Sequence, residues 1–376
     1  MKNILHVINV YFSLSYFGDQ FKYFGEKGYR EHLICSPSEY LEGYAKKNGI
    51  KYLEVPVNRK ISIIDDLKAI WRVFRYIKKN KIDVVSGHTP KGAMVGMIAA
   101  FLANVPIRLY FRHGLAYETS KGLTRFLIKN TDRITSLCAT KIICASPSVL
   151  EVSLADRLAP PRKQVVLLKG TCGGIDTNKV FNPSNIDNKS LDTLRKQYKI
   201  DNDDFVVGFT GRLVKDKGIE ELVNAFKQLE GKSKIKLLLV GLFEERDAIS
   251  TETREYILNS ENIIYTGFVN ENIQLFYSLM DVYVLPSYRE GFPTGVLEAQ
   301  SMKTPVLTTR VTGCIDSIID GQTGYYISHD PSDIASKIDH IRINSPINTS
   351  NCRKWVETYF RNQVIWDEIE KYYIDK

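Results

Sequence analysis

The stretch Tyr283-Val-Leu-Pro-Ser-Tyr-Arg-Glu-Gly-Phe-Pro-Thr-Gly-Val-Leu-Glu298 places two carboxylates eight residues apart, on either side of a predicted change from strand to helix. Its first residues continue a short apolar run typical of buried strands, and the glycine and proline after Glu290 keep the loop from continuing as a helix. Pro293 suits a first helical position. From about Thr294 apolar residues recur at helical spacing, so Glu298 is expected one turn inside a helix and Glu290 ahead of it.

The start of this predicted helix combines groups that bind phosphate with groups that bind sugar. The free N–H groups of Thr294, Gly295 and Val296 and the positive end of the helix dipole suit a phosphate. The carboxylates of Glu290 and Glu298 suit sugar hydroxyl groups. Phosphate next to a polyol indicates a nucleotide sugar. On this stretch alone a second interpretation stays open, in which both acids are ordinary solvated carboxylates at a helix start, where acids are favoured.

A basic loop about 80 residues earlier complements the two acids. Phe209-Thr-Gly-Arg-Leu-Val-Lys-Asp-Lys-Gly-Ile-Glu-Glu-Leu222 predicts a strand end, a Gly211-Arg212 turn, a lysine-rich loop and a helix in succession. Arg212 offers a planar fork to a diphosphate and Lys217 adds a flexible point charge. Gly218 permits a tight entry into the helix. A basic loop exposed to solvent is the alternative interpretation of this segment taken by itself.

The two motifs together resemble retaining glycosyltransferase family 4, whose members have the two-domain GT-B fold. The resemblance rests on Glu290-Gly-Phe-Pro293 and Leu297-Glu298-Ala299, which are similar to the family's E-x7-E region, and on the following Pro305-Val306 and Gly321-Gln-Thr-Gly324. It is dense over residues 208–325 and sparse before residue 85.

The resemblance implies a role for each charged residue of the two motifs. Arg212 and Lys217 match the family residues that hold the leaving diphosphate. Glu290 matches the residue that holds the hydroxyl groups of the donor sugar, and Glu298 matches the one that holds the ribose. These assignments imply a catalytic donor site that stabilises negative charge on the leaving oxygen.

Two further positions follow from the same resemblance. Gly211 is expected beside the nucleotide, and Phe268 lies where the family fold meets the nucleobase. The glycine-rich stretch Gly170-Thr-Cys-Gly-Gly-Ile-Asp176 resembles the family's N-G-x-D stretch, with Gly173 where asparagine is usual, and is expected to join two domains.

Two loops of the first half are candidates for the rest of the site. Tyr110-Phe-Arg-His-Gly-Leu-Ala-Tyr-Glu118 puts a histidine and an arginine just past an expected strand, where a doubly wound sheet presents active residues. His113 resembles a family histidine that lies against the donor sugar. The other loop, Ser86-Gly-His-Thr-Pro-Lys-Gly92, resembles the H-x-P region of bacterial polysaccharide transferases, which implies that His88 and Lys91 meet the diphosphate of the acceptor. A structural histidine and a helix-capping turn are the alternatives.

Short apolar runs alternate with helical patterns in both halves, which predicts an α/β protein. Its expected form is GT-B, two doubly wound Rossmann-like domains facing a cleft. The expected strands are Ile4–Val10, Glu31–Cys35, Lys51–Val55, Asp83–Ser86, Arg108–Phe111, Lys141–Ala145, Gln164–Leu168, Phe205–Thr210, Ile235–Val240, Ile263–Thr266, Val282–Pro286, Pro305–Thr308 and Gly324–Ser328. The expected domains are residues 1–170, with a C-terminal helix from about 355 to 376 crossing back onto them, and residues 171–354.

Composition limits the class of protein and its partners. A chain of 376 residues with 44% hydrophobic and 25% charged residues predicts a globular protein with two cores. The first apolar stretch is too short for a signal peptide, so a cytosolic location is expected. The net charge of +8 draws on mixed basic and apolar stretches at 71–81 and 121–133, which fit either an anionic lipid surface or the solvated face of a packed helix. Without a nucleic-acid-binding motif, charge alone does not predict nucleic acid as a partner.

Together with these observations, the resemblance implies an enzyme at the inner face of the cytoplasmic membrane. It is expected to move a sugar, of N-acetylhexosamine type, from a UDP-sugar to an undecaprenyl-diphosphate-linked saccharide in capsule or O-antigen assembly. Retention of configuration is implied by the family, with a front-face route preferred. Neither a metal nor another cofactor is expected, because the D-x-D spelling Asp201-Asn-Asp203 reads as a polar turn. The alternatives are a UDP-sugar epimerase or hydrolase and a non-catalytic nucleotide-sugar-binding assembly subunit.

Overall fold

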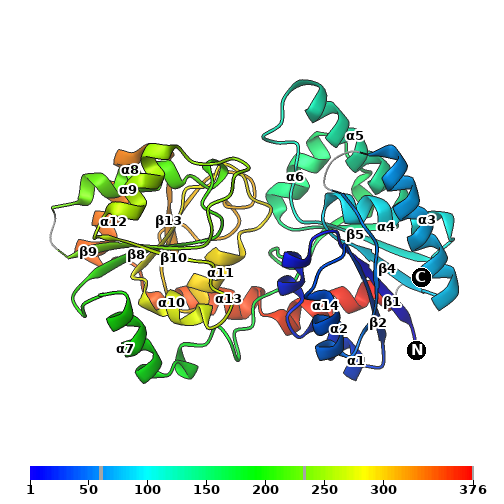
Figure 1. Ribbon diagram of the computed structural model, residues 1–376, viewed down its shortest axis with the longest axis horizontal. Coiled ribbons are helices and arrows are strands. Elements are labelled where there is room, and N and C mark those ends of the chain that lie inside the picture. The colour runs from blue at the N-terminus through cyan, green and yellow to red at the C-terminus, as the bar shows by residue number, and fades with distance from the viewer. Residues whose placement is uncertain (59–61, 232–233, 375–376) are drawn as a thin grey trace. The chain divides into compact units, whose positions relative to one another are not determined.

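A computed structural model describes residues 1–58, 62–231 and 234–374. The chain divides into two compact units, unit 1 comprising Met1–Gly174 with Asn362–Lys376 and unit 2 comprising Ile175–Arg361 (Figure 1). The boundaries between the two units therefore follow residues 174 and 361, whereas the sequence predicted them after residues 170 and 354.

Unit 1 is built on a parallel sheet of seven strands in the order β3-β2-β1-β4-β5-β6-β7. The strands are β1 (Asn3–Val7), β2 (Arg30–Cys35), β3 (Lys51–Glu54), β4 (Val84–Gly87), β5 (Ile107–Arg112), β6 (Lys141–Cys144) and β7 (Gln164–Val166). Each overlaps one of the predicted apolar runs. Because the strand order reverses beside β1, the connections run outward in both directions, as in a doubly wound sheet.

Helices cover both faces of this sheet (Figure 1). The larger core lies under α3 (Ile63–Asn80), α4 (Pro90–Leu102), α5 (Gly122–Cys138) and α6 (Pro147–Ala155). The smaller core lies under the 3-10 helix η1 (Tyr11–Phe17), α1 (Gln20–Glu26) and α2 (Leu41–Asn48). Within the described part of the chain, no helix has both the length and the apolar character needed to cross a lipid bilayer.

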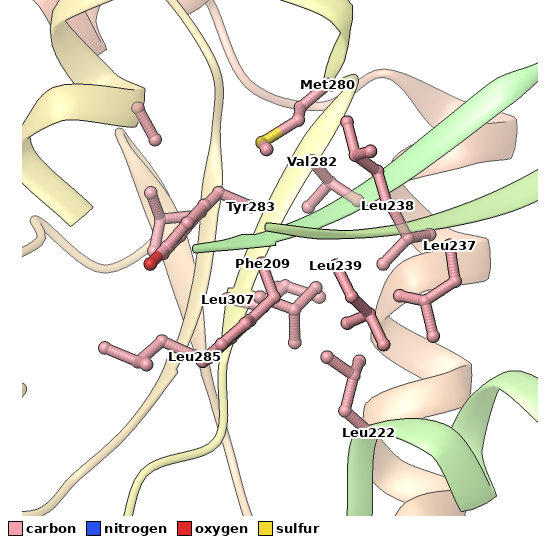
Figure 2. Close-up of a cluster of buried hydrophobic side chains, with 14 of the residues drawn as sticks. Phe209, Leu222, Leu237, Leu238, Leu239, Met280, Val282, Tyr283, Leu285 and Leu307 are labelled. Atoms are coloured by element: carbon pink, nitrogen blue, oxygen red, sulfur yellow. The ribbon is translucent and has the colours of Figure 1, made fainter. Parts of the chain in front are cut away.

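Unit 2 repeats the architecture with six parallel strands in the order β10-β9-β8-β11-β12-β13. The strands are β8 (Phe205–Thr210), β9 (Ile235–Val240), β10 (Ile263–Gly267), β11 (Val282–Leu285), β12 (Val306–Thr309) and β13 (Gly324–Ile327). The helices are α7 (Asn188–Gln197), α8 (Ile219–Leu229), α9 (Thr251–Asn259), α10 (Ile273–Leu279), α11 (Thr294–Ser301), α12 (Pro331–Asn344) and α13 (Thr349–Tyr359). Strands and helices enclose a hydrophobic core that includes leucine, valine and aromatic side chains (Figure 2).

The C-terminal segment differs from the single helix expected at about 355–376. It forms two helices, α13 in unit 2 and α14 (Asn362–Ile374) in unit 1, and residues 375 and 376 lie outside the described part. Helix α14 packs on α1, where the ring centroids of Trp366 and Tyr23 are 5.1 Å apart and Lys27 forms an ion pair of 2.9 Å with Asp367. The expected return to the first domain is therefore made by α14 alone.

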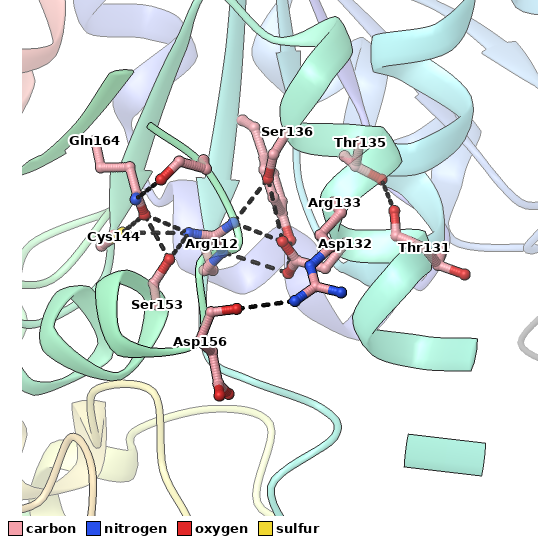
Figure 3. A network of polar contacts seen from close by, with 12 residues as sticks. Arg112, Thr131, Asp132, Arg133, Thr135, Ser136, Cys144, Ser153, Asp156 and Gln164 are labelled. Carbon is pink, nitrogen blue, oxygen red and sulfur yellow. Dashed lines mark hydrogen bonds and ion pairs between the residues drawn. The ribbon is translucent and has the colours of Figure 1, made fainter. Parts of the chain in front are cut away.

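A buried arginine holds the larger core of unit 1 together (Figure 3). The sequence placed Arg112 in an active loop beside His113, but the structure turns its side chain into the core, because successive residues of a strand point to opposite faces. Its guanidinium forms an ion pair of 2.5 Å with Asp132 of α5 and donates to Ser153 of α6 at 2.6 Å and to Gln164 of β7 at 2.8 Å. One cation thus joins β5 to three other elements.

This network predicts a large loss of stability when its charge is unbalanced. Asp132→Asn is expected to lower the free energy of unfolding by about 3–5 kcal/mol, because Arg112 keeps its buried charge without a counter-ion. Urea denaturation measures the loss. The double variant Arg112→Met with Asp132→Leu is the control and is expected to recover most of the stability, since it removes both charges. Equal stability of Asp132→Asn and the unmodified chain would contradict this account.

Candidate active site

The loop between β11 and α11 carries the two predicted carboxylates. Helix α11 begins at Thr294, as the sequence predicted, but Pro293 is the residue before the helix, with φ −78° and ψ 101°, and not its first turn. Glu298 lies one turn inside the helix and Glu290 four residues ahead of it. The main-chain N–H groups of Thr294, Gly295 and Val296 therefore stand at the helix start as expected.

The basic loop after β8 and the acidic loop after β11 form one structure. Lys217 makes an ion pair with Glu290, and both side chains are largely buried, at 18% and 13% exposed. The carbonyl oxygen of Asp216 accepts a hydrogen bond from the amide of Tyr288 at 2.9 Å. The carboxylate of Asp216 also accepts from Arg289 at 2.9 Å. Two motifs more than 70 residues apart in sequence are thus joined by main-chain and side-chain contacts.

Gly218 is the point where these two loops touch. It has a φ of +71°, and a Cβ atom there would lie 2.1 Å from the carbonyl oxygen of Pro286. No side chain fits at that distance, so the predicted need for a small residue at the entry to α8 has a steric cause as well as a conformational one.

A group of connected hydroxyl groups supports the carboxylate of Glu298. Tyr277 of α10 donates to its carboxylate at 2.6 Å, and the hydroxyl oxygens of Tyr277 and Thr210 are 2.7 Å apart. A third hydroxyl, of Tyr283, lies 3.2 Å from the Thr210 oxygen. Burial raises the pKa of Glu298, and the hydrogen bond from Tyr277 opposes that rise. The carboxylate is therefore fixed in one orientation beside the start of α11.

Sequence reasoning missed these supporting hydroxyls. The available signal was a polar group in an apolar strand, since Tyr283 interrupts the run Val282-Tyr-Val-Leu285. A buried tyrosine hydroxyl needs a partner, so such a position marks a polar network next to the strand.

Arg212 is separate from the Lys217–Glu290 contact. Its exposed side chain pairs with Glu244, in the segment after β9, at 2.8 Å. Gly211 precedes it with a φ of +138°, and Phe268, just after β10, is exposed to solvent. Glu244 was not among the predicted residues, because the pairing joins segments that are 32 positions apart. The structure places Gly211 at the end of the central strand β8 and Phe268 at the end of the edge strand β10.

In unit 1 the two predicted histidines are in contact. The Nδ1 atom of His88 lies 3.2 Å from Nε2 of His113. The other nitrogen of His88 is 3.1 Å from Nδ1 of His6, so both of its ring nitrogens are occupied by histidines. Lys91 pairs with Asp66 of α3. An acceptor diphosphate would therefore have to displace an existing partner to reach either His88 or Lys91.

Both histidines are held neutral. His88 is buried, at 6% exposed, and burial followed by the nearness of His6 and His113 lowers its pKa well below the usual value. Burial lowers the pKa of His113 to about 4. At neutral pH each ring therefore carries one proton, on one of its two nitrogens.

No metal site accompanies these residues in the described part of the chain, where no group of three or more His, Cys, Asp or Glu side chains is arranged to hold an ion. The segment Asp201-Asn-Asp203 is a turn, in which the amide of Asp201 donates to the carboxylate of Asp204 at 2.8 Å. Whether the reaction needs a metal stays a prediction from sequence.

Comparisons with known proteins agree with this architecture. A family model described as glycosyl transferases group 1 matches residues 191–358, and one described as glycosyl transferase 4-like matches residues 4–146. The capsular polysaccharide biosynthesis glycosyltransferase CapM of Staphylococcus aureus is 35% identical, over 99% of this chain and 97% of its own. A UDP-Gal:alpha-D-GlcNAc-diphosphoundecaprenol alpha-1,3-galactosyltransferase of Escherichia coli is 27% identical, over 92% of this chain and 88% of its own.

A solved structure extends the comparison to the fold. Anabaena HepE in complex with UDP-glucose superposes with a TM-score of 0.81, covering 99% of each chain at 18% sequence identity. At that identity the likeness concerns the fold, and the predicted GT-B class is confirmed.

The contact at Gly218 predicts a local effect of substitution. Gly218→Ala is expected to speed amide hydrogen exchange at Tyr288, because the added Cβ atom pushes apart the loops that the Tyr288 amide joins. Gly231→Ala is the matched control, since its φ of +90° carries similar backbone strain while a Cβ atom would meet no atom of the described residues within 4 Å. Each variant is expected to lose about 1–2 kcal/mol of stability from that strain. Unchanged exchange at Tyr288 in Gly218→Ala would refute the steric argument.

Proposed function

Since the chain belongs to the glycosyl transferases group 1 family, we propose that it moves an N-acetylhexosamine-type sugar from a UDP-sugar to an undecaprenyl-diphosphate-linked saccharide. Its class as a glycosyltransferase of GT-B fold is established, and the donor, the acceptor and the stereochemical course are what we propose. The observation that carries the proposal is the buried contact between Lys217 and Glu290 at the start of α11.

We propose that unit 2 binds the donor. Lys217 and Arg212 supply positive charge to the diphosphate, and the N–H groups at the start of α11 add hydrogen bonds to it. Glu290 and Glu298 accept hydrogen bonds from the donor sugar and the ribose. Because Lys217 already lies on Glu290, a diphosphate and a sugar hydroxyl presented together can replace this ion pair with one new partner for each side chain.

Transfer of the sugar breaks the bond between the anomeric carbon and the diphosphate oxygen, and the electron pair stays with the diphosphate. The acceptor hydroxyl forms the new bond on the same face, and its proton passes to the departing diphosphate, which gives retention. We propose that Arg212 and Lys217 neutralise the growing negative charge and that no metal cofactor is needed. His113 is assigned to the donor sugar, as its family resemblance implies.

The proposed acceptor and setting draw on the relatives. The E. coli relative is named for a GlcNAc-diphosphoundecaprenol substrate, and CapM for capsular polysaccharide biosynthesis. An acceptor with a polyprenyl chain lies in a membrane, so the enzyme that uses it must work at that surface. We therefore propose that the chain associates with the cytoplasmic face of the membrane and acts in surface polysaccharide biosynthesis.

Unit 1 carries an exposed apolar surface that supports this location. Leu123, Phe126 and Leu127 stand on the outer side of α5, exposed at 71%, 62% and 42%. Helix α4 packs between α5 and α3, and α3 exposes a second apolar stripe that includes Leu67 and Trp71. Exposed lysines and arginines, among them those of the 71–81 stretch, accompany the stripe on α3. Bulky apolar groups beside cations are typical of helices that lie on anionic bilayers.

The basic residues of α5 have a structural role as well. Lys129 pairs with Asp156 at 2.6 Å, and Arg133 donates to the Asp156 carbonyl oxygen at 3.0 Å. Reversing their charge would break these contacts between α5 and the end of α6. The apolar residues Leu123, Phe126 and Leu127 are therefore the better probes of membrane binding.

The donor assignment predicts a selective loss of activity. Lys217→Met is expected to lower kcat for sugar transfer by roughly 100- to 1,000-fold, because it removes a positive group that stabilises the leaving diphosphate. The assay follows transfer from UDP- and GDP-sugars, with and without a chelator, to synthetic polyprenyl-diphosphate saccharides. UDP-galactose is included because the E. coli relative is named for it.

Lys215→Met is the matched control for this loss. Lys215 belongs to the same loop but is exposed to solvent, so its substitution is expected to change kcat by less than about threefold. Similar activity of the Lys217→Met variant and the unmodified chain would overturn the site assignment. Epimer or free sugar formed from a UDP-sugar without acceptor would favour the epimerase or hydrolase alternative.

The membrane assignment makes a separate prediction. Replacing Leu123, Phe126 and Leu127 together by serine is expected to weaken binding to vesicles containing phosphatidylglycerol by at least about tenfold, because each apolar side chain loses its burial in the interface. Co-flotation with vesicles measures the binding. The matched control replaces three exposed apolar residues of unit 2, Leu242, Leu258 and Ile343, and is expected to bind as the unmodified chain does. Equal loss in both variants would contradict the assignment.

A further inference from the structure

A series of buried titratable side chains, each within hydrogen-bond distance of the next, leads from His113 into unit 1. The Nε2 atom of His6 lies 3.1 Å from Glu31 Oε2, and its Nδ1 atom lies 3.1 Å from His88 Nε2. His88 Nδ1 in turn lies 3.2 Å from His113 Nε2. The four residues come from β2, β1 and the ends of β4 and β5, which are consecutive neighbours in the sheet. Each link joins one strand to the next.

The chain is enclosed on the η1 and α1 face of unit 1. The ring of His6 meets Phe17 and Phe21 edge-on, with centroids 5.1 and 5.2 Å away, and His88 stacks on Phe111 at 4.5 Å. His6 and Glu31 are nearly inaccessible, with side chains 0% and 2% exposed. Such walls exclude water, so each polar atom depends on its neighbour in the chain.

Glu31 is the acidic end of the chain. Its Oε2 atom faces His6, while its Oε1 atom is buried and has no hydrogen-bond donor in the described part of the protein. Burial raises the pKa of Glu31, and the hydrogen bond with His6 opposes the rise. The other titratable groups near this carboxylate are Tyr29 and Tyr373.

Three hydrogen bonds in series allow two arrangements with neutral rings. With Glu31 ionised, each histidine carries its proton on Nε2 and donates toward Glu31, so His113 has an unprotonated Nδ1. One added proton at His113 Nδ1 reverses every donor and acceptor. Each Nε2 proton then moves one residue along, and the last rests on the Glu31–His6 pair. The protonation state of Glu31, at the other end of this series of side chains, therefore determines which nitrogen of His113 is unprotonated.

We propose that Glu31 is a positioning residue, which through His6 and His88 holds His113 in the tautomer that carries its proton on Nε2 and presents Nδ1 as a hydrogen-bond acceptor to a substrate hydroxyl. The proposal rests on the proposed function in assigning His113 to the sugar. Neutral rings suit this task, because an imidazolium has no acceptor nitrogen. His88 then acts as a link in the chain instead of as a ligand of the acceptor diphosphate.

Nitrogen NMR of the full-length protein tests this relay, the series of hydrogen bonds from Glu31 through His6 and His88 to His113, without any measurement of activity. The chain contains six histidines, so selective 15N-histidine labelling gives few signals, each assigned by substituting one residue at a time. At neutral pH the spectra of His6, His88 and His113 are expected to show a protonated Nε2 and an unprotonated Nδ1. Finding His113 protonated on Nδ1 in the unmodified chain would overturn the proposal.

Two variants break the chain at different links. Glu31→Leu removes the terminal acceptor, and His6→Phe interrupts the chain while keeping a ring between Phe17 and Phe21. In both, His113 is expected to lose its preference for the Nε2 proton. Glu42→Leu, on the exposed surface of α2, is the control and is expected to leave the His113 signals unchanged. An unaltered His113 tautomer in both folded variants would rule the relay out.

Kinetics distinguish positioning from simple structural support. Both variants are expected to lower kcat by roughly 10- to 100-fold, the value of one hydrogen bond to substrate, with the KM for the UDP-sugar nearly unchanged. If His113→Ala transfers sugar normally, the assignment of His113 to the sugar fails, and with it the proposed link to substrate. The NMR result decides the relay itself independently of that outcome.

Discussion

The site in unit 2 depends on a main-chain contact that leaves no room for a side chain. At Gly218 a Cβ atom would lie 2.1 Å from the Pro286 carbonyl oxygen, so at this point the backbones of the loops after β8 and β11 are in direct contact. The hydrogen bond from the Tyr288 amide to the Asp216 carbonyl oxygen, at 2.9 Å, fixes their register. A parallel sheet brings its strand ends to one edge, but only such close contact brings Lys217 to its carboxylate partner where solvent screens the pair weakly.

The candidate site residues of the two units are buried by different means. In unit 2 the charges of Lys217 and Glu290 are kept and paired, which leaves a cation and an anion ready to exchange partners. In unit 1 burial keeps His88 and His113 neutral, and hydrogen bonds replace charge pairing. A buried ion pair suits a ligand that carries its own charge, whereas a series of neutral histidines suits a ligand that offers a hydroxyl group. The proposed roles use this difference, with a diphosphate as the partner of Lys217 and a hydroxyl group as the partner of His113.

Local patterns in the sequence predicted most of the fold, and non-local contacts account for what it missed. All the predicted strands are present, and α11 begins at Thr294, because apolar periodicity and turn residues act within a few positions. Glu31 and Tyr277 were missed because their partners lie 25 and 21 positions away and no short motif contains both members. The prediction for Arg112 was wrong because it placed Arg112 in the site on account of its neighbour His113. Consecutive residues of a strand face opposite sides of the sheet. The C-terminal segment divides between α13 and α14, where Arg361 forms a bridge with Ile175 at the other crossing of the chain, and no short motif contains both residues.

The Lys217–Glu290 contact also bears on how the proposed site distinguishes an intact donor from its product. Free UDP can offer a diphosphate to Lys217, but it leaves Glu290 in a largely buried position without its cation. An unpartnered buried carboxylate is costly, so part of the attraction between Lys217 and the diphosphate is lost in separating the pair. A UDP-sugar brings hydroxyl groups together with its diphosphate, and both members of the pair then gain partners in one step. In the proposed site, the return of Lys217 to Glu290 after the sugar has left would weaken the binding of UDP and favour its release.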